Sequence, residues 1–133
     1  MTKADIKSWN RKELEEFIVD RGEKPFRARQ IYAWLHQRQA ASFQEMTDIS
    51  KDLKEQLAKS CELTVLRQER RQVSTIDGTR KYLFALADGA MIESVLMRYK
   101  HGNSVCISSQ AGCRMGCRFC ASTLDGLVRN LTP

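Results

Sequence analysis

The sequence predicts an α+β protein in which a small helical domain is followed by a β-meander and then by a first βα unit. Apolar residues recur at helical spacing as far as about residue 60, and from about residue 63 they follow strand patterns with turn signals between them. A strand-like run at 105–110 then leads directly into three closely spaced cysteines. We therefore expect three parts: a helical accessory domain (1–60), a β-meander (61–100) and the start of a larger α/β domain (101–133).

The composition indicates a globular protein with an uneven charge distribution. Hydrophobic residues make up 42% and charged residues 29%, and no apolar run approaches the roughly 18 residues that span a bilayer. The N-terminus lacks the apolar stretch of a signal peptide, so we expect a cytoplasmic protein without a membrane partner. The net charge is +6, of which residues 98–133 carry +4, from five basic side chains and one acid. Such a surface suits nucleic acid, although solvated basic residues on an ordinary protein explain it equally well.

The first helix is marked at both ends. Asn10 and Glu13 have the spacing of a capping box, in which each side chain satisfies a free backbone N–H of the first turn. Gly22 is expected to end the helix, because glycine readily adopts the positive φ of a helix C-terminus. The apolar face between these signals comprises Leu14, Phe17 and Ile18.

Further helices are expected before residue 60. Pro25 suits the first turn of a second helix, whose apolar set is Phe26, Ile31, Trp34 and Leu35. Ser42 and Glu45 predict another capping box, and Ser50 caps a later helix that buries Leu53 and Leu57. The aromatic residues of the second helix are expected in the core, and the arginines between them are better candidates for phosphate contacts. The domain is thus either an RNA-binding module or a packing domain.

The following segment is predicted to form antiparallel strands. A first strand opens at 64–66, and the Asp77-Gly78 pair predicts a two-residue hairpin turn into a strand at 81–86. Asp88-Gly89 marks the next turn, before a strand at 91–99. Another strand is expected at 104–109, and the residues after the cysteines are read as the beginning of a helix.

Three of the five cysteines lie within eight residues, in the order C-x3-C-x2-C: Cys113, Cys117 and Cys120. Thiols at such spacing in a cytosolic protein indicate metal or redox chemistry more often than disulfides. A structural zinc site needs four protein ligands, and a fourth from Cys106 or His101 would be possible but irregular. A bacterial ferredoxin needs another cysteine and a proline after the third, which residues 121–123 do not supply.

The favoured interpretation is an iron–sulfur cube with an open coordination site. A 4Fe–4S cluster has four irons, so a loop with three thiolates leaves one iron free for another ligand. The spacing after a strand, with the aromatic Phe119 between the second and third cysteines, resembles the motif of the radical S-adenosylmethionine enzymes.

The resemblance extends to most of the chain and is closest to one family. Residues 105–113, 117–122 and 126–131 resemble the cluster region of the bacterial dual-specificity RNA adenine-C2 methyltransferases. Residues 22–31 and 42–47 resemble the N-terminal helical domain of the same family, and the motifs occur in the family's order. This resemblance implies that residues 101–133 begin a partial (β/α) barrel of the radical-SAM type and that residues 1–60 bind RNA.

The resemblance also implies roles for individual residues. Cys113, Cys117 and Cys120 match the cluster ligands, and S-adenosylmethionine would bind the open iron and be cleaved there to a radical. Glu93 matches the family's proton acceptor, although from the residues alone a solvent-facing strand carboxylate would be the preferred reading. Cys106 matches a cysteine that helps to release methylated RNA from its covalent link to the enzyme, where a small buried strand residue is the alternative. Cys61 matches nothing and is expected to pack in the core.

Substrates and partners follow from the same resemblance. The family methylates C2 of one adenosine in 23S rRNA and of the adenosine next to the anticodon of certain tRNAs. Because C2 is not nucleophilic, the family first methylates one of its own cysteines and activates that methyl group by radical chemistry. A base and a thiol are then needed to finish the reaction. An electron donor such as flavodoxin is implied, and a monomer is expected.

The chain departs from the family in length. Most of the partial barrel and the methyl-carrying cysteine have no counterpart in these 133 residues, so we expect an N-terminal fragment without turnover of its own. Two alternatives remain: a non-catalytic RNA- or zinc-binding module, and a relative that methylates C8 of adenosine. The match of the helical segment to the C2 enzymes argues against the C8 relative without excluding it.

Overall fold

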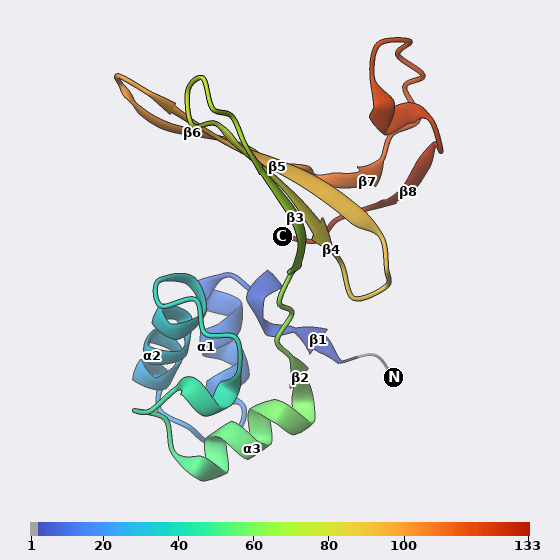
Figure 1. The fold of residues 1–133 in the computed structure, drawn as a ribbon. Coiled ribbons are helices and arrows are strands. Elements are labelled where there is room, and N and C mark those ends of the chain that lie inside the picture. The colour runs from blue at the N-terminus through green and yellow to red at the C-terminus, as the bar shows by residue number, and fades with distance from the viewer. Residues whose placement is uncertain (1–2) are drawn as a thin grey trace. The chain divides into compact units, whose positions relative to one another are not determined.

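The computed structural model describes residues 3–133 and divides the chain into two compact units (Figure 1). The helical unit comprises Met1–Val65 together with Pro133, and the sheet unit comprises Leu66–Thr132. The α-helices are confined to the first unit and the longer strands to the second, which confirms the mixed α+β class. No helix among the described residues is both long and apolar enough to cross a bilayer.

The helical unit contains three α-helices framed by two very short strands. Strand β1 (Ala4–Asp5) pairs in parallel with β2 (Cys61–Glu62), which brings the two ends of the unit together. Between them lie η1 (Ile6–Ser8), α1 (Arg11–Val19), α2 (Pro25–His36), η2 (Phe43–Glu45) and α3 (Lys51–Ser60). Their apolar faces meet in one core: Ile6, Leu14, Ile18, Ala28, Ile31, Leu35, Ala40, Phe43, Met46, Ile49, Leu53, Leu57 and Cys61.

The predicted helix ends are mostly confirmed. The Asn10 side chain accepts from the backbone N–H groups of Lys12 and Glu13, and the Glu13 carboxylate accepts from the N–H of Asn10, which completes the capping box. Gly22, at φ 78°, ends the first helix. Ser50 caps α3 by accepting from the N–H of Leu53. These signals were readable because each depends on a few neighbouring residues only.

Two local predictions in this unit are wrong. Ser42 caps no α-helix: its hydroxyl donates to the Glu45 carboxylate at 3.1 Å, and the segment forms a single 3-10 turn. Phe26 is 40% exposed, with the Arg27 guanidinium 4.8 Å from its ring centroid. It lies in the first turn of α2, whose residue in the core is Ala28. Trp34 packs partly against the core, as expected, and its Nε1–H donates to Asp48 at 2.6 Å.

The sheet unit is built on a four-stranded antiparallel meander, which confirms the predicted meander in outline. Its first strand begins at Arg67 and not at 64–66, and its fourth strand lies in the segment that was expected to begin the next domain. Strands β3 (Arg67–Val73), β4 (Arg80–Ala85), β5 (Met91–Tyr99) and β6 (Gly102–Cys106) lie in chain order. A separate hairpin follows, made of β7 (Gln110–Gly112) and β8 (Leu127–Asn130), with the cysteine loop and η3 (Ala121–Thr123) between its strands. Figure 1 shows this hairpin and its loop in red, continuing from one end of the meander.

Three details of this unit differ from the sequence prediction. The β3–β4 connection is longer than a two-residue turn, because Ser74 pairs with Thr79 and encloses four residues that end in Gly78 at φ 72°. The strand expected at 104–109 is broken at residues 107–109, so that β6 joins the meander and β7 joins the hairpin. The residues after the cysteines form strand β8 instead of a helix, and no βα unit occurs within the described residues.

Candidate active site

The meander places Glu93 and Cys106 on the same face of the sheet. Val95 on β5 lies opposite Cys106 on β6, and side chains two residues apart on a strand point to the same side. Glu93 therefore lies diagonally across from Cys106. Both side chains are exposed, so neither residue is a buried packing residue of the sheet.

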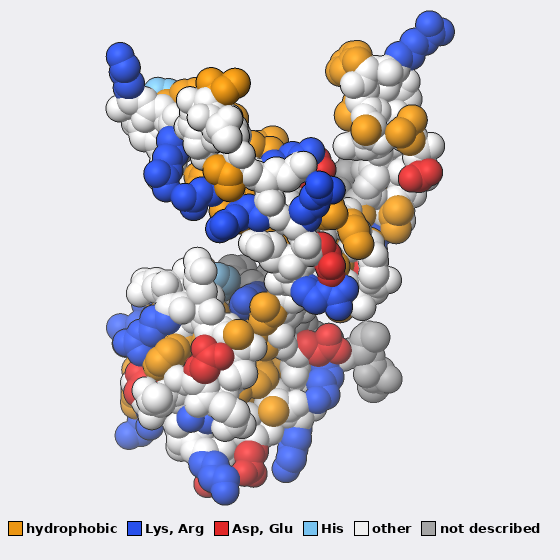
Figure 2. Space-filling model, in the orientation of Figure 1, with side chains coloured by type: hydrophobic (Ala, Val, Ile, Leu, Met, Phe, Trp, Pro, Cys, Tyr) orange, Lys and Arg blue, Asp and Glu red, His pale blue; other side chains and the backbone are white. Residues whose placement is uncertain are grey.

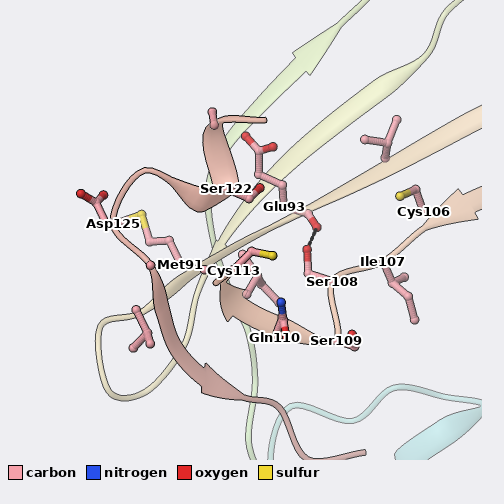
Figure 3. A pocket seen from close by; sticks show the side chains of 16 residues that line it. Met91, Glu93, Cys106, Ile107, Ser108, Ser109, Gln110, Cys113, Ser122 and Asp125 are labelled. Carbon is pink, nitrogen blue, oxygen red and sulfur yellow. Dashed lines mark hydrogen bonds between the residues drawn. The ribbon is translucent and has the colours of Figure 1, made fainter. Parts of the chain in front are cut away.

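One cavity of about 840 Å³ brings these two residues together with the first cysteine of the loop. Its wall contains Glu93 from β5, Cys106 at the end of β6 and Cys113 just after β7. Figure 3 shows Glu93 and Cys113 near the centre of this region, with Cys106 towards one side. The other labelled polar residues on the wall are Ser108, Ser109, Gln110, Ser122 and Asp125. Three residues that are distant in sequence thus face a common space.

Two contacts fix the position of Glu93. The Lys81 ammonium on β4 lies 3.2 Å from the Glu93 carboxylate, and both side chains are about half exposed. The Ser108 hydroxyl donates to the backbone carbonyl oxygen of Glu93 at 2.7 Å (Figure 3). The first contact orients the carboxylate, and the second ties the break between β6 and β7 to the middle of β5.

The cysteine loop is closed at its base by a close approach of two backbone segments. The N–H of Cys113 donates to the carbonyl oxygen of Gly126 at 3.0 Å. Gly112 adopts φ 73°, and a Cβ at this position would lie 2.1 Å from the same oxygen. Only glycine fits here, because both the backbone conformation and the space exclude a side chain.

Within the loop, backbone groups order the other two cysteines. The N–H of Cys120 donates to the carbonyl oxygen of Cys117 at 3.2 Å. The Thr123 hydroxyl lies within donating distance of the carbonyl oxygens of Cys117 and Cys120. The three thiols are free and partly exposed. Of these three loop cysteines, Cys113 lines the cavity described above, and Cys117 and Cys120 do not.

The loop carries a suitable donor set without presenting a formed metal site. Among residues 3–133, no three His, Cys, Asp or Glu side chains are grouped closely enough to hold one metal ion. Three free thiols on one short loop are nevertheless the ligands that an iron–sulfur cluster requires. The donor chemistry fits the cluster, and closure of residues 113–120 around it would bring the thiols together.

The remaining cysteine has a different environment. Cys61 is 2% exposed at the junction of α3 and β2, within the core of the helical unit. Burial raises the pKa of its thiol, because the interior disfavours the thiolate, and the positive charges of Arg21 and Lys3 offset this only in part. A protonated, buried thiol is a packing residue and not a nucleophile.

Two residues that shape the site were not found from sequence. Lys81 and Ser108 contact Glu93 only because of the strand register and the break at 107–109. Strand alternation could have placed Lys81 on the Glu93 face if the loop length between β4 and β5 had been known. No local signal marks Ser108.

Comparisons with known proteins agree with the resemblance of the sequence. Residues 4–63 match the family model described as Ribosomal RNA large subunit methyltransferase N-terminal domain. A protein from Lachnospira eligens named Probable dual-specificity RNA methyltransferase RlmN is 57% identical over 130 residues, which cover 98% of this chain and 37% of that protein. A protein of the same name from Bacillus subtilis is 52% identical over 97% of this chain. Nearly the whole chain is therefore similar to the N-terminal part of these RNA methyltransferases.

A solved structure extends the relationship to three dimensions. A radical SAM methyltransferase from Sphaerobacter thermophilus matches 96% of this chain with a TM-score of 0.84 and 42% sequence identity. The aligned part is 38% of that structure. The chain thus spans a little over a third of the length of the curated relatives it matches.

Proposed function

We propose that this chain supplies the cluster ligands, a base and a thiol to a radical-SAM methyltransferase that modifies C2 of adenosine in RNA. The substrates proposed are 23S rRNA and tRNA next to the anticodon, in the cytoplasm. The observation that carries this proposal is the cavity shared by Glu93, Cys106 and Cys113. A chain similar to these methyltransferases, with those three groups at one site, has the components that the chemistry needs.

Cys113, Cys117 and Cys120 are the proposed ligands of a 4Fe–4S cluster, with S-adenosylmethionine at its fourth iron. When bound, this pair supplies the electron transfer and the radical that activate a methyl group. The hairpin of β7 and β8 is proposed to open the partial (β/α) barrel of the complete enzyme. The anchor between Cys113 and Gly126 would hold the base of the loop while its thiols close on the cluster.

Glu93 is the proposed acceptor of the proton on C2. Its carboxylate lines the cavity and needs no large movement to meet a base bound there. Lys81 holds this carboxylate at 3.2 Å, which orients it. The positive charge would also attract an anionic RNA substrate.

Cys106 is the proposed nucleophile that breaks the covalent link between protein and RNA. Its thiol is exposed and lines the same cavity as Glu93. Exposure leaves the Cys106 thiol within reach of a bound substrate, whereas the Cys61 thiol is buried and its pKa is raised by burial. The other four cysteines are the three proposed cluster ligands and the buried Cys61, so none is left to carry the methyl group. We therefore expect no methylation of RNA by the 133 residues alone.

Anaerobic reconstitution with iron and sulfide tests the proposal. We expect a brown protein with about four irons per chain, and loss of the bound iron in a Cys117→Ser variant. The matched control is Cys61→Ser, a thiol outside the loop, which should keep the iron. Stoichiometric zinc in a colourless protein would instead support a non-catalytic zinc-binding module.

The position of methylation needs a separate measurement. Mass-spectrometric mapping of RNA modified by a full-length enzyme that contains these residues should locate the methyl group on C2. A methyl group on C8 would assign the chain to the related C8 enzymes.

A further inference from the structure

The four-stranded sheet has a second face that the proposed chemistry does not use. Strand register places Arg71, Tyr82 and Ser94 in one row across β3, β4 and β5. Phe84 and Arg80 lie two residues from Tyr82 on β4 and therefore on the same side. Arg80 is opposite Leu96 on β5, which places Arg98 on this side too. We call the face with these residues the arginine face: Arg71, Arg80, Arg98, Tyr82 and Phe84.

The arginine face is positively charged without compensation. Of the two carboxylates in strands β3–β6, Glu93 lies on the opposite face, opposite Leu83, in an ion pair with Lys81. The other, Glu69, lies at the irregularity in β3 and is paired with Arg67. Arg71 and Arg98 are exposed, and Arg80 is half-buried. Figure 2 shows Lys and Arg side chains gathered over the strands of the sheet unit, with few acidic ones among them.

Two aromatic rings lie beside these guanidinium groups: Tyr82 is opposite Arg71, and Phe84 is the next residue of this face along β4. The rings of Tyr82 and Phe84 are stacked, with centroids 5.7 Å apart and planes at 6°. Both side chains are half-buried on the central part of the sheet, so part of each ring is accessible. Parallel aromatic surfaces on an antiparallel sheet, flanked by arginines, suit unpaired bases and the phosphates that join them.

We propose that the arginine face binds a single-stranded segment of RNA. The choice of RNA as the nucleic acid rests on the proposed function; the single-stranded form follows from the stacked rings, which a duplex could not reach. Because this face is opposite the one with Glu93 and Cys106, it would hold a segment that flanks the modified base. The arginines neutralise phosphates, and the two rings stack on neighbouring bases.

Fluorescence anisotropy with a short, unstructured oligouridine tests the arginines. The variant R71Q/R80Q removes two charges from the arginine face. The control R67Q/R70Q removes two charges from the opposite face of β3, since Arg67 and Arg70 lie opposite Ala85 and Leu83. We expect the slope of log K against log salt to fall by about 1.4 in the first variant, from about 0.7 for each phosphate contact on a single strand. The control should change by less than half of that.

The aromatic contribution has its own matched pair. Tyr82→Leu removes a ring from the arginine face, and Tyr99→Leu removes an exposed ring that stacks on His101 on the opposite side of the sheet. We expect Kd for the oligouridine to rise at least about fivefold in the first and to stay unchanged in the second. Circular dichroism identifies any variant that fails to fold, in which case the arginine pair decides.

Equal effects of the two charge variants would overturn the proposal, because they would show general attraction by net charge. Absence of binding by the unmodified chain at low salt would also overturn it. Neither result bears on the proposed function, which depends on iron content. Conversely, if the chain binds RNA through the arginine face but takes up no iron, the proposed RNA-binding face stands and the proposed cluster is refuted.

Discussion

The helical unit and the sheet unit bury their apolar residues to very different extents. The helical unit gathers thirteen described residues in one core. In the described part of the sheet unit, the buried apolar residues are Ala85, Ile92 and Ala111. Around the cysteine loop, large apolar side chains are exposed instead: Ile107, Met115, Phe119, Leu124 and Val128. Figure 2 shows hydrophobic side chains on the surface of the hairpin of β7 and β8 and its loop.

The two units therefore contribute differently: the helical unit provides most of the buried apolar surface, and the sheet unit carries the residues proposed for catalysis. The helical unit gains its free energy of folding from apolar burial, the dominant favourable contribution in most domains. The sheet unit is held chiefly by backbone hydrogen bonds and a few side-chain contacts, and such regions open at lower cost. The residues proposed for catalysis all lie in this second unit, where the cysteine loop would have to close around the proposed cluster.

The largest expected effect is the loss of a core side chain in the helical unit. Leu57→Ala removes a fully buried side chain and should lower the free energy of unfolding by about 2–5 kcal/mol. Both tryptophans, Trp9 and Trp34, lie in this unit, so their fluorescence during urea unfolding reports on it. The matched change in the sheet unit is Val105→Ala, at a side chain that is 61% exposed, and it should cost less than about 0.5 kcal/mol. Equal losses in the two variants would contradict the proposed difference between the units.

A smaller effect is expected at the base of the cysteine loop. Gly112→Ala would place a Cβ 2.1 Å from the Gly126 carbonyl oxygen, so the two backbone segments must separate. We expect faster amide hydrogen exchange at Cys113 and in β8, with an opening cost lower by about 1–3 kcal/mol. Gly116→Ala is the control, since Gly116 has a similar φ of 70° but open space around it. A control that loosens β8 as much as Gly112→Ala would show that backbone strain alone, and not the close approach, is responsible.

The smallest effect is a pH-dependent contact within the sheet unit. The Asp88 carboxylate accepts from the Arg129 side chain at 2.5 Å, which links the β4–β5 turn to β8. This hydrogen bond, with one from the N–H of Ala90, lowers the pKa of Asp88. The contact is therefore complete above the ordinary pKa of aspartate, about 3.9, and is lost as pH falls through the lowered value. The Arg129 Nε–H resonance should shift over that range, and Asp88→Asn should remove the transition. An unchanged resonance down to the unfolding pH would contradict the contact.

Local signals predicted the helical unit better than the sheet unit. The caps at Asn10 and Ser50 and the stop at Gly22 depend on neighbouring residues and are confirmed. The meander was predicted in outline, but its long β3–β4 loop and strand β8 were not, because both depend on pairing between distant segments. Thus periodicity identifies an element, whereas its partners and register depend on the rest of the fold.

The candidate site was predictable only in part, for the same reason. The spacing of the cysteines indicated metal chemistry directly, while Glu93 and Cys106 had structural alternatives that only the family resemblance outweighed. Their approach to Cys113 in one cavity depends on the register of β5 with β6 and on the break at 107–109. Lys81 and Ser108 became visible only with that register.

The proposed function requires three cysteines to hold a cluster with one iron open to S-adenosylmethionine. Electron paramagnetic resonance of the reconstituted and reduced chain tests it directly, with spectra recorded before and after addition of S-adenosylmethionine. We expect the spectrum to change on addition, because a ligand at the open iron alters its electronic environment. The same change should be absent when adenosine, which lacks the chelating amino acid, is added in place of S-adenosylmethionine. A cluster signal that S-adenosylmethionine leaves unaltered would contradict the open iron and, with it, the proposed function.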